Sequence, residues 1–265
     1  MNRSILTVPV RKIDGQSSTE PVQDLLAVEE PLEIKLNGRT VSITMRTPGH
    51  DYELAAGFLF TEGILASASQ VERIAFLSPN TVQVELAAGN EPDLDRLQRN
   101  FYTTSSCGVC GKASIEAIHA QGCSILSSES PLITTQVIHR LPASLRGEQS
   151  VFDRTGGLHA AALFDPSGQL HILREDIGRH NAVDKLIGAP FLENCTPLDD
   201  RLMLVSGRAS FELVQKAVMA GIPILAAVGA PSSLAVETAR RFNMTLLGFV
   251  RDGRFNIYSG AARIQ

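Results

Sequence analysis

The sequence contains no long apolar run, no basic cluster and few cysteines, and each absence argues against a class of protein. No run of about 18 apolar residues is present, so we expect no membrane-spanning helix. The N-terminal apolar stretch is broken at Pro9, too early for a secretory signal peptide. Lys and Arg never run longer than two residues and the formal net charge is −4, which argues against a nucleic-acid partner. Four cysteines in 265 residues are too few for a disulfide scaffold, so we expect a cytoplasmic protein with reduced thiols.

What the sequence does contain is enough apolar material for a large core, since 44% of its residues are hydrophobic. Residues 31–46 alternate apolar and polar side chains around Asn37-Gly38, which predicts a β-hairpin because both residues tolerate positive φ. The patterns that follow predict a helix, two strands and a second helix, over residues 51–65, 71–78, 81–87 and 91–102. We therefore predict a smaller α+β region over residues 1–102.

The remainder, residues 103–265, alternates apolar strands with amphipathic helices. Two paired strands are predicted around Pro166-Ser167-Gly168, after a helix over 134–146. Strand and helix then alternate twice between residues 201 and 243, and the chain ends in a hairpin on Asp252-Gly253. Apolar strands alternating with helices predict an α/β domain whose mixed, partly parallel sheet is covered by helices.

The most informative motif is Cys107-Gly108-Val109-Cys110, in a glycine-rich turn that leads into a predicted helix. A helix N-terminus favours the reactive thiolate, and small flanking residues leave the sulfur open. The motif alone leaves four interpretations open: a persulfide carrier, a redox thiol, a structural zinc site and inert surface cysteines.

A structural zinc site needs four ligands, and only His119 and Cys123 lie near enough in sequence to complete one. The zinc deaminase signature is absent, because no histidine is followed two residues later by Glu. We therefore expect no metal site of the protein's own. Cys123 and Cys195 belong to no motif and are interpreted as incidental.

A second group of polar residues follows Gly156-Gly157. It comprises His159, Asp176, His180 and Asp184. Residues 176, 180 and 184 are four apart, so they share one face if the segment is helical. Either a polar pocket with acid–base chemistry or a buried structural network fits this spacing.

A third group lies in two turns between a buried strand and a helix. Such turns present backbone N–H groups at a helix N-terminus, which suits phosphate. The residues concerned are Ser206, Gly207, Arg208, Gly229, Ser232 and Ser233. Neither turn matches a known phosphate-binding motif, and most turns of this kind only connect elements.

Several long segments together resemble the formate dehydrogenase accessory sulfurtransferase family (FdhD). They are CGVCGK, FDRTGGLHAAALF, REDIGRHNAVDKLIG, SGRASFELVQKA, GIPILAAVGAPSSLAVETA and GFVRDGRFNIY, and the resemblance runs from about residue 20 to the C-terminus. It implies a cytidine-deaminase-like fold without the catalytic zinc over residues 103–265. It also implies a cytoplasmic homodimer that takes sulfur from a cysteine desulfurase. The sulfur passes to molybdenum bound by two pterin guanine dinucleotides, before the cofactor enters formate dehydrogenase.

The resemblance also implies roles for individual residues. Cys107 becomes the persulfide-bearing nucleophile, and Cys110 assists transfer from the same loop. The residues that bind the molybdenum cofactor fall on the C-terminal hairpin, at Phe249, Val250, Arg251, Asp252, Gly253 and Arg254. Arginine suits this role because its planar guanidinium binds phosphate bidentately. The alternatives are a C-x-x-C thiol–disulfide oxidoreductase and a zinc-stabilised chaperone of the dehydrogenase.

Overall fold

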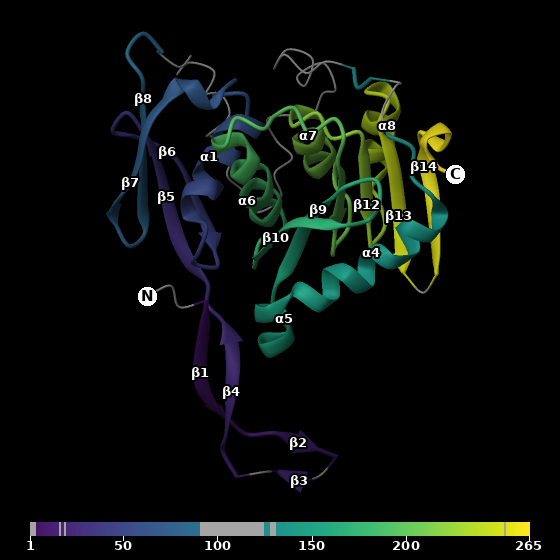
Figure 1. Cartoon of the computed structure of the whole chain (residues 1–265). Helices are drawn as coiled ribbons and strands as arrows, with labels where there is room; N and C mark the ends of the chain where they lie inside the picture. Colours follow the sequence, from purple (N-terminus) through teal and green to yellow (C-terminus); the bar gives the residue numbers. More distant parts are fainter. Residues whose placement is uncertain (1–3, 16, 19, 91–124, 128–130, 252) are drawn as a thin grey trace.

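The computed structural model describes residues 4–15, 17–18, 20–90, 125–127, 131–251 and 253–265. Figure 1 shows its sheets and helices stacked side by side in layers. A four-stranded sheet is followed by α1 (Asp51–Thr61) and α6 (Arg179–Leu192), then by a six-stranded sheet, and then by α4 (Thr135–Glu148). The predicted mixed sheet covered by helices, preceded by a smaller α+β region, is confirmed. None of the helices in these ranges is long and apolar enough to cross a membrane.

A two-stranded ribbon precedes the first sheet and projects from the body of the molecule (Figure 1). β1 (Ile5–Val10) pairs with β4 (Val22–Ala27), and the short strands β2 (Ile13–Asp14) and β3 (Ser17–Ser18) pair farther along it. Leu6 and Leu26 face each other across the ribbon and are both exposed. The sequence patterns did not predict this ribbon.

The four-stranded sheet contains the hairpin predicted around Asn37-Gly38. Its strands, in spatial order, are β6 (Arg39–Arg46), β5 (Glu30–Leu36), β8 (Thr81–Leu86) and β7 (Val71–Ser78). Asn37 and Gly38 have φ values of 46° and 82°, so the turn uses the left-handed region that these residues tolerate. The short helix η1 (Ala68–Gln70) leads into β7.

The six-stranded sheet follows the predicted alternation of strands and helices. Its strands are, in spatial order, β10 (Leu170–Asp176), β9 (His159–Phe164), β11 (Leu202–Val205), β12 (Ile224–Ala227), β13 (Thr245–Arg251) and β14 (Arg254–Ser259). β11, β12 and β13 are parallel, and the remaining pairs are antiparallel. α7 (Phe211–Met219) and α8 (Ser233–Arg241) cover one face together with α6, while α4 covers the other. The short helices α5 (Ser150–Thr155) and η2 (Ala261–Arg263) complete the fold.

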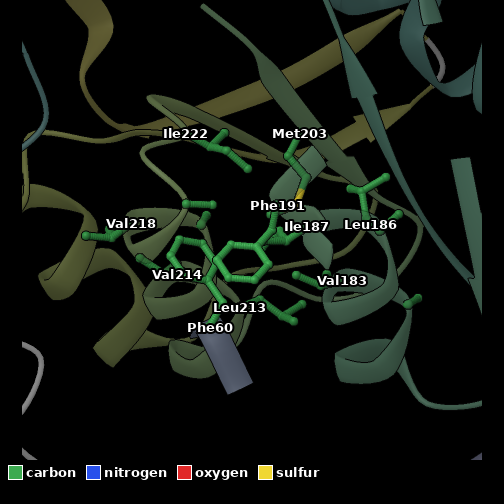
Figure 2. Close-up of a cluster of buried hydrophobic side chains, with 14 of the residues drawn as sticks. Phe60, Val183, Leu186, Ile187, Phe191, Met203, Leu213, Val214, Val218 and Ile222 are labelled. Carbon is green, nitrogen blue, oxygen red and sulfur yellow. The ribbon is translucent and has the colours of Figure 1, made fainter. Parts of the chain in front are cut away.

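The largest core joins the two sheets through α6. Figure 2 shows its centre, where Phe60 of α1 meets Phe191 of α6 among side chains from the larger sheet and α7. The rings of Phe60 and Phe191 stack with centroids 4.7 Å apart. The sequence-based division at residue 102 falls outside the described residues and stays a prediction, but this core is continuous across the two regions.

α1 and α6 cross so closely that glycine is required on both helices. A Cβ atom on Gly57 would overlap the backbone carbonyl of Asp184, and one on Gly188 would overlap the carbonyl of Glu53. Both obstructions are backbone atoms, which cannot move aside as a flexible side chain can. The contact therefore fixes the distance between the two helices.

We expect Gly57→Ala to destabilise the protein by about 1–3 kcal/mol or more, because the added methyl group forces α1 and α6 apart. Chemical denaturation followed by circular dichroism measures the change. Gly147→Ala in α4 is the matched control, since nothing lies within 4 Å of its Cβ position. There the higher helix propensity of alanine is expected to leave stability equal or slightly raised. Equal stability of the two variants would contradict a close crossing.

Candidate functional site

One edge of the six-stranded sheet collects most of the residues that the sequence singled out. The parallel strands β11, β12 and β13 all end at this edge, and the antiparallel strand β9 begins there. β10 also ends there, since Asp176 pairs with His159. α6, α7 and α8 each start just after one of these strand ends, so three helix N-termini lie along the same edge. In open α/β sheets this is the edge at which ligands bind.

A pocket of about 620 Å³ opens at this edge, on the side of the sheet that α4 covers. Its wall is largely apolar, and none of its residues is acidic. The lining consists of Pro142, Leu145, Arg146, Gln149, Phe152, Gly156, Gly157, Leu158, His159, Ser206 and Val228. The pocket therefore offers an apolar surface with a few polar groups, as small-molecule sites usually do.

α4 and α5 form the outer wall of this pocket. The Arg146 guanidinium lies 4.5 Å from the centroid of the Phe152 ring and 2.6 Å from the Asp153 carboxylate. Glu175 at the end of β10 accepts hydrogen bonds from the backbone N–H groups of Val151 and Phe152, at 3.1 and 2.8 Å. This carboxylate occupies the N-terminus of α5, where a negative charge is favourable, and so fixes α5 against the sheet.

His159 is one of the polar residues that line the pocket. Its ring has room because Gly207 lies beside it, where a Cβ atom would be 3.3 Å from Nδ1. Burial lowers the pKa of His159, and the positive charges of Arg179 and His180 lower it further, while Asp176 acts in the opposite direction. The imidazole is therefore mainly neutral near pH 7. Neither ring nitrogen has a hydrogen-bond partner among the residues that the structure describes.

His180 links the starts of α6 and α7. Its Nε2 atom lies 3.3 Å from the Ser210 hydroxyl and 3.7 Å from the Glu212 carboxylate. The hydrogen bond from His180 is the main reason why the pKa of Glu212 falls to about 2.

Asp176 is not on a helix with His180 and Asp184, which corrects the shared face that their spacing suggested. Asp176 ends β10, and α6 begins only at Arg179. The Asp176 carboxylate is fully buried and lies 2.6 Å from the Lys185 ammonium. It also accepts hydrogen bonds from the N–H groups of Thr47 and Gly178. Asp176 therefore belongs to a structural network.

Asp184 belongs to a second buried ion pair, away from the pocket. Its carboxylate oxygens lie 2.8 and 3.0 Å from Nζ of Lys216, and Thr61 donates a hydrogen bond to it at 2.8 Å. The Lys216 ammonium also donates to the Thr61 hydroxyl at 2.9 Å. The three residues come from α6, α7 and α1, so this network connects three helices.

The two small-residue turns bind mainly to each other. Gly229 N–H donates to the Gly207 carbonyl at 2.9 Å, and Ser232 N–H donates to the Ala209 carbonyl at 3.0 Å. The Ser232 hydroxyl caps α8 by accepting from Ala235 N–H. Of the six turn residues that the sequence proposed, the structure places only Ser206 in the pocket wall. Arg208 and Ser233 are exposed at the same edge.

The C-terminal hairpin begins beside the pocket. Phe249 N–H donates to the Gly229 carbonyl at 3.0 Å, one residue from Val228 in the pocket wall. Phe249 has a φ of 55°, and the ladder between β13 and β14 is irregular between Gly248 and Arg251. Val250 is fully buried against α4, so the strand stays anchored up to that point.

Two arginines face each other at the tip of this hairpin. Arg251 pairs with Arg254 across the ladder, both side chains are exposed, and Gly253 lies in the turn. The Arg251 guanidinium lies 5.9 Å from the centroid of the Phe249 ring. Like charges directly opposite each other are unfavourable, and neither arginine has a carboxylate partner among the described residues. Asp252 lies outside the described residues.

Cys107 and Cys110 also lie outside the described residues, as do His119 and Cys123, so their predicted roles stay predictions. Within the described ranges, no three His, Cys, Asp or Glu side chains are grouped closely enough to hold a metal ion. The sequence patterns did not single out the pocket residues of α4, such as Arg146, or Gln149, which lies between α4 and α5. Pro142, which lies inside the predicted helix and also lines the pocket, is the one unusual residue in that segment that could have drawn attention to it.

Comparison with known proteins gives consistent matches. Residues 27–265 match the FdhD/NarQ family. The chain is 52% identical over 266 residues to the sulfur carrier protein FdhD of Streptomyces coelicolor, covering 96% of this chain and 93% of that protein. It is 51% identical over 260 residues to the protein of the same name from Mycolicibacterium paratuberculosis, covering 94% of each. A crystal structure from Desulfotalea psychrophila, described as a formate dehydrogenase accessory protein, has the same fold, with a TM-score of 0.79 at 24% identity over 98% of this chain and 99% of that one.

We expect Asp184→Asn to destabilise the fold by about 3–5 kcal/mol, because it leaves the buried Lys216 ammonium without its main counter-charge. The Glu62 carboxylate lies 3.5 Å from Nζ of Lys216 and remains as a partial counter-charge. We therefore expect a loss of stability near the lower end of this range. Adding Lys216→Met to Asp184→Asn is expected to recover part of the loss, which urea denaturation measures. Asp200→Asn is the control, because the side chain of Asp200 is 65% exposed and its contact with Arg201 contributes at most about 1 kcal/mol. An unchanged stability in Asp184→Asn would contradict the structural role of this residue.

Proposed function

Because this chain belongs to the FdhD/NarQ family, we propose that it is a sulfur carrier that serves formate dehydrogenase. The observation that carries this proposal is the identity of about half of all residues, over nearly the whole chain, with proteins named sulfur carrier protein FdhD. In more detail, the chain acts as a sulfurtransferase. It takes sulfur from a cysteine desulfurase and delivers it to molybdenum held by two pterin guanine dinucleotides, before that cofactor enters the dehydrogenase.

Cys107 holds the sulfur in this proposal. Its thiolate attacks the outer sulfur of the desulfurase persulfide, and the desulfurase cysteine leaves as a thiolate. One S–S bond breaks while another forms, so this exchange needs no oxidant or reductant. Cys110 assists the later release of sulfur from Cys107.

The molybdenum cofactor is the acceptor, and the C-terminal hairpin binds it. Arg251 and Arg254 face each other without a counter-charge in the described residues, so a bound diphosphate would remove an unfavourable contact. The half-buried Phe249 and the apolar wall of the adjoining pocket offer surface to the flat rings of the same ligand. The strand up to Val250 is rigidly anchored, which holds this hairpin in place before the ligand arrives.

Two other functions are compatible with the C-x-x-C motif. A thiol–disulfide oxidoreductase would cycle between Cys107–Cys110 disulfide and dithiol, and a zinc-stabilised chaperone of the dehydrogenase would hold a metal through its cysteines. We expect the proposed carrier to be a cytoplasmic homodimer.

Incubation with a cysteine desulfurase and free cysteine is expected to add one sulfur, about 32 Da, to the peptide that contains Cys107. Peptide mass spectrometry before and after reduction measures this, and the addition should disappear on reduction and in Cys107→Ala. Cys195→Ala is the matched control, because Cys195 is exposed in the segment that follows α6, belongs to no motif and should not affect loading. A Cys107–Cys110 disulfide or bound zinc in place of added sulfur would support one of the two alternatives.

GDP stands for the guanosine diphosphate group of one pterin guanine dinucleotide. The double substitution Arg251→Ala/Arg254→Ala is expected to weaken the binding of GDP by at least about tenfold. Loss of two charge-assisted contacts to phosphate accounts for a change of this size. Isothermal titration calorimetry measures the affinity. Arg39→Ala is the control, because Arg39 is an exposed arginine at the start of β6, next to the Asn37-Gly38 turn. Unchanged affinity in the double variant would place the cofactor elsewhere.

A further inference from the structure

The ribbon formed by β1 and β4 has one apolar face that lies outside the hydrophobic cores. Directly opposite residues of an antiparallel pair point to the same side, and every second pair shares a face. Leu6, Leu26 and Val22 share one face of the ribbon and are 51%, 45% and 38% exposed. Val8 and Val10 extend the same apolar row, in which the one charged residue is Asp24. Neither core of the described residues includes a side chain of the ribbon.

The opposite face of the ribbon is supported at its base by the body of the molecule. α5 packs against β4 there. A Cβ atom on Gly157 would lie 3.4 Å from the Cβ atom of Ala27, which points to this opposite face. A two-stranded ribbon is marginally stable in water unless another element packs on it. The apolar face, which projects into solvent in Figure 1, therefore calls for a second molecule.

The first part of the chain carries most of the exposed apolar surface. Of the twelve large apolar side chains that are exposed in the described residues, nine lie between residues 5 and 78, four of them in the ribbon. Ile43 and Met45 are 62% and 47% exposed and lie on β6, an edge strand of the four-stranded sheet. They point away from α6, because Thr44 between them donates a hydrogen bond to Asn181 of that helix. Exposed apolar surface of this kind marks sites of interaction.

The ribbon is joined too closely to the sheet to cover Ile43 and Met45 of its own chain. β4 ends at Ala27 and β5 begins at Glu30, so two residues separate them. Val28 N–H donates to the Ser4 carbonyl at 2.9 Å, which extends the pairing to the base of the ribbon. So short a link cannot reverse the direction of the ribbon over the same sheet. A second copy of the chain presents the same two surfaces.

The size of the ribbon also favours a second copy. Six residue pairs at about 3.3 Å per residue make the ribbon roughly 20 Å long. One face of this length supplies only part of the roughly 800 Å² per partner that a stable interface buries. A two-fold axis doubles the contact, because each copy then gives its own ribbon and receives the other. A partner that only receives the ribbon would bury half as much.

We propose that the ribbon is an arm exchanged between two copies of this chain, whose apolar face packs on Ile43 and Met45 of the second copy. The inference rests on the proposed function, because it names the surface that forms the expected homodimer. It also sets the interface beside the pocket, since the base of the ribbon contacts Gly157 in the pocket wall.

Leu6→Ser/Leu26→Ser is expected to raise the dissociation constant of the dimer at least about tenfold, because each arm loses two apolar side chains from the contact. Sedimentation velocity of the full-length protein over a series of concentrations measures this constant. Thr7→Ser/Gln23→Ser is the matched control, because both residues are exposed in the same strands but point to the opposite face. The control should dimerise like the unmodified protein, and circular dichroism shows whether both variants fold.

A mixing experiment identifies the surface that receives the arm. Leu26→Lys and Met45→Glu are each expected to be monomeric, because in both contacts of the dimer a charge then meets an apolar side chain. Mixed in equal amounts, the two variants should form a heterodimer. One of its contacts is unmodified, and the other brings the introduced lysine to the introduced glutamate. Native mass spectrometry separates this heterodimer from either homodimer.

A monomeric unmodified protein across the concentration series would overturn the inference. So would unchanged dimerisation of Leu6→Ser/Leu26→Ser, or a mixture of Leu26→Lys and Met45→Glu that stays monomeric. If the serine variant does not fold, the mixing experiment decides alone. Sulfur loading on Cys107, measured by mass spectrometry on the unmodified protein, shows separately whether the carrier function holds, so the two proposals can fail independently.

Discussion

The contact between α1 and α6 is the constraint on which the rest of the structure depends. Gly57 and Gly188 let each helix press against the backbone of the other, so the distance between them is set by main-chain atoms. The buried pair of Asp184 and Lys216, with Thr61, then fixes how the two helices are rotated and joins α7 to them. Since α6 begins at the edge where the pocket opens, the same contact determines where Arg179 and His180 stand. The smaller sheet thereby takes part in positioning the site, and Thr47, directly after its strand β6, also donates a hydrogen bond to Asp176.

The pocket edge brings together residues that are far apart in the sequence because parallel strands place their carboxyl ends on one side of a sheet. His159, Ser206 and Val228 meet in this way in the pocket wall. Backbone hydrogen bonds join Gly207 to Gly229 and Gly229 to Phe249, so the start of the hairpin is positioned by the same turns. The left-handed backbone of Phe249 interrupts the ladder just before the hairpin tip. The two arginines of the hairpin therefore lie on a strand pair that begins beside the apolar pocket wall.

Most of the fold could be predicted from the sequence, because apolar strands, amphipathic helices and turn residues such as Asn37-Gly38 are local signals. The ribbon over residues 5–27 was missed, since its side chains are largely exposed and it lacks an alternating pattern. The grouping of Asp176 with His180 and Asp184 was wrong because β10 continues to Asp176 and the helix starts later. Of the pocket, His159 and the segment that begins at Phe152 were singled out from the sequence, whereas Arg146 and Gln149 reach it only through the packing of α4 on the sheet. The C-terminal hairpin was predicted as a structural element, and its role in binding the cofactor stays a prediction.

The separation of α1 and α6 along the chain has a consequence for synthesis. Thr61 and Asp184, which meet in the folded protein, are 123 residues apart in sequence. At ribosomal rates of roughly 5–20 residues per second, α1 leaves the ribosome several seconds or more before the helix that covers it. During that interval its apolar face, including Leu54, Leu59 and Phe60, has only the small sheet to pack against. The nascent chain is therefore most exposed to aggregation before the second half emerges, which makes this interval the stage at which a general chaperone would help most.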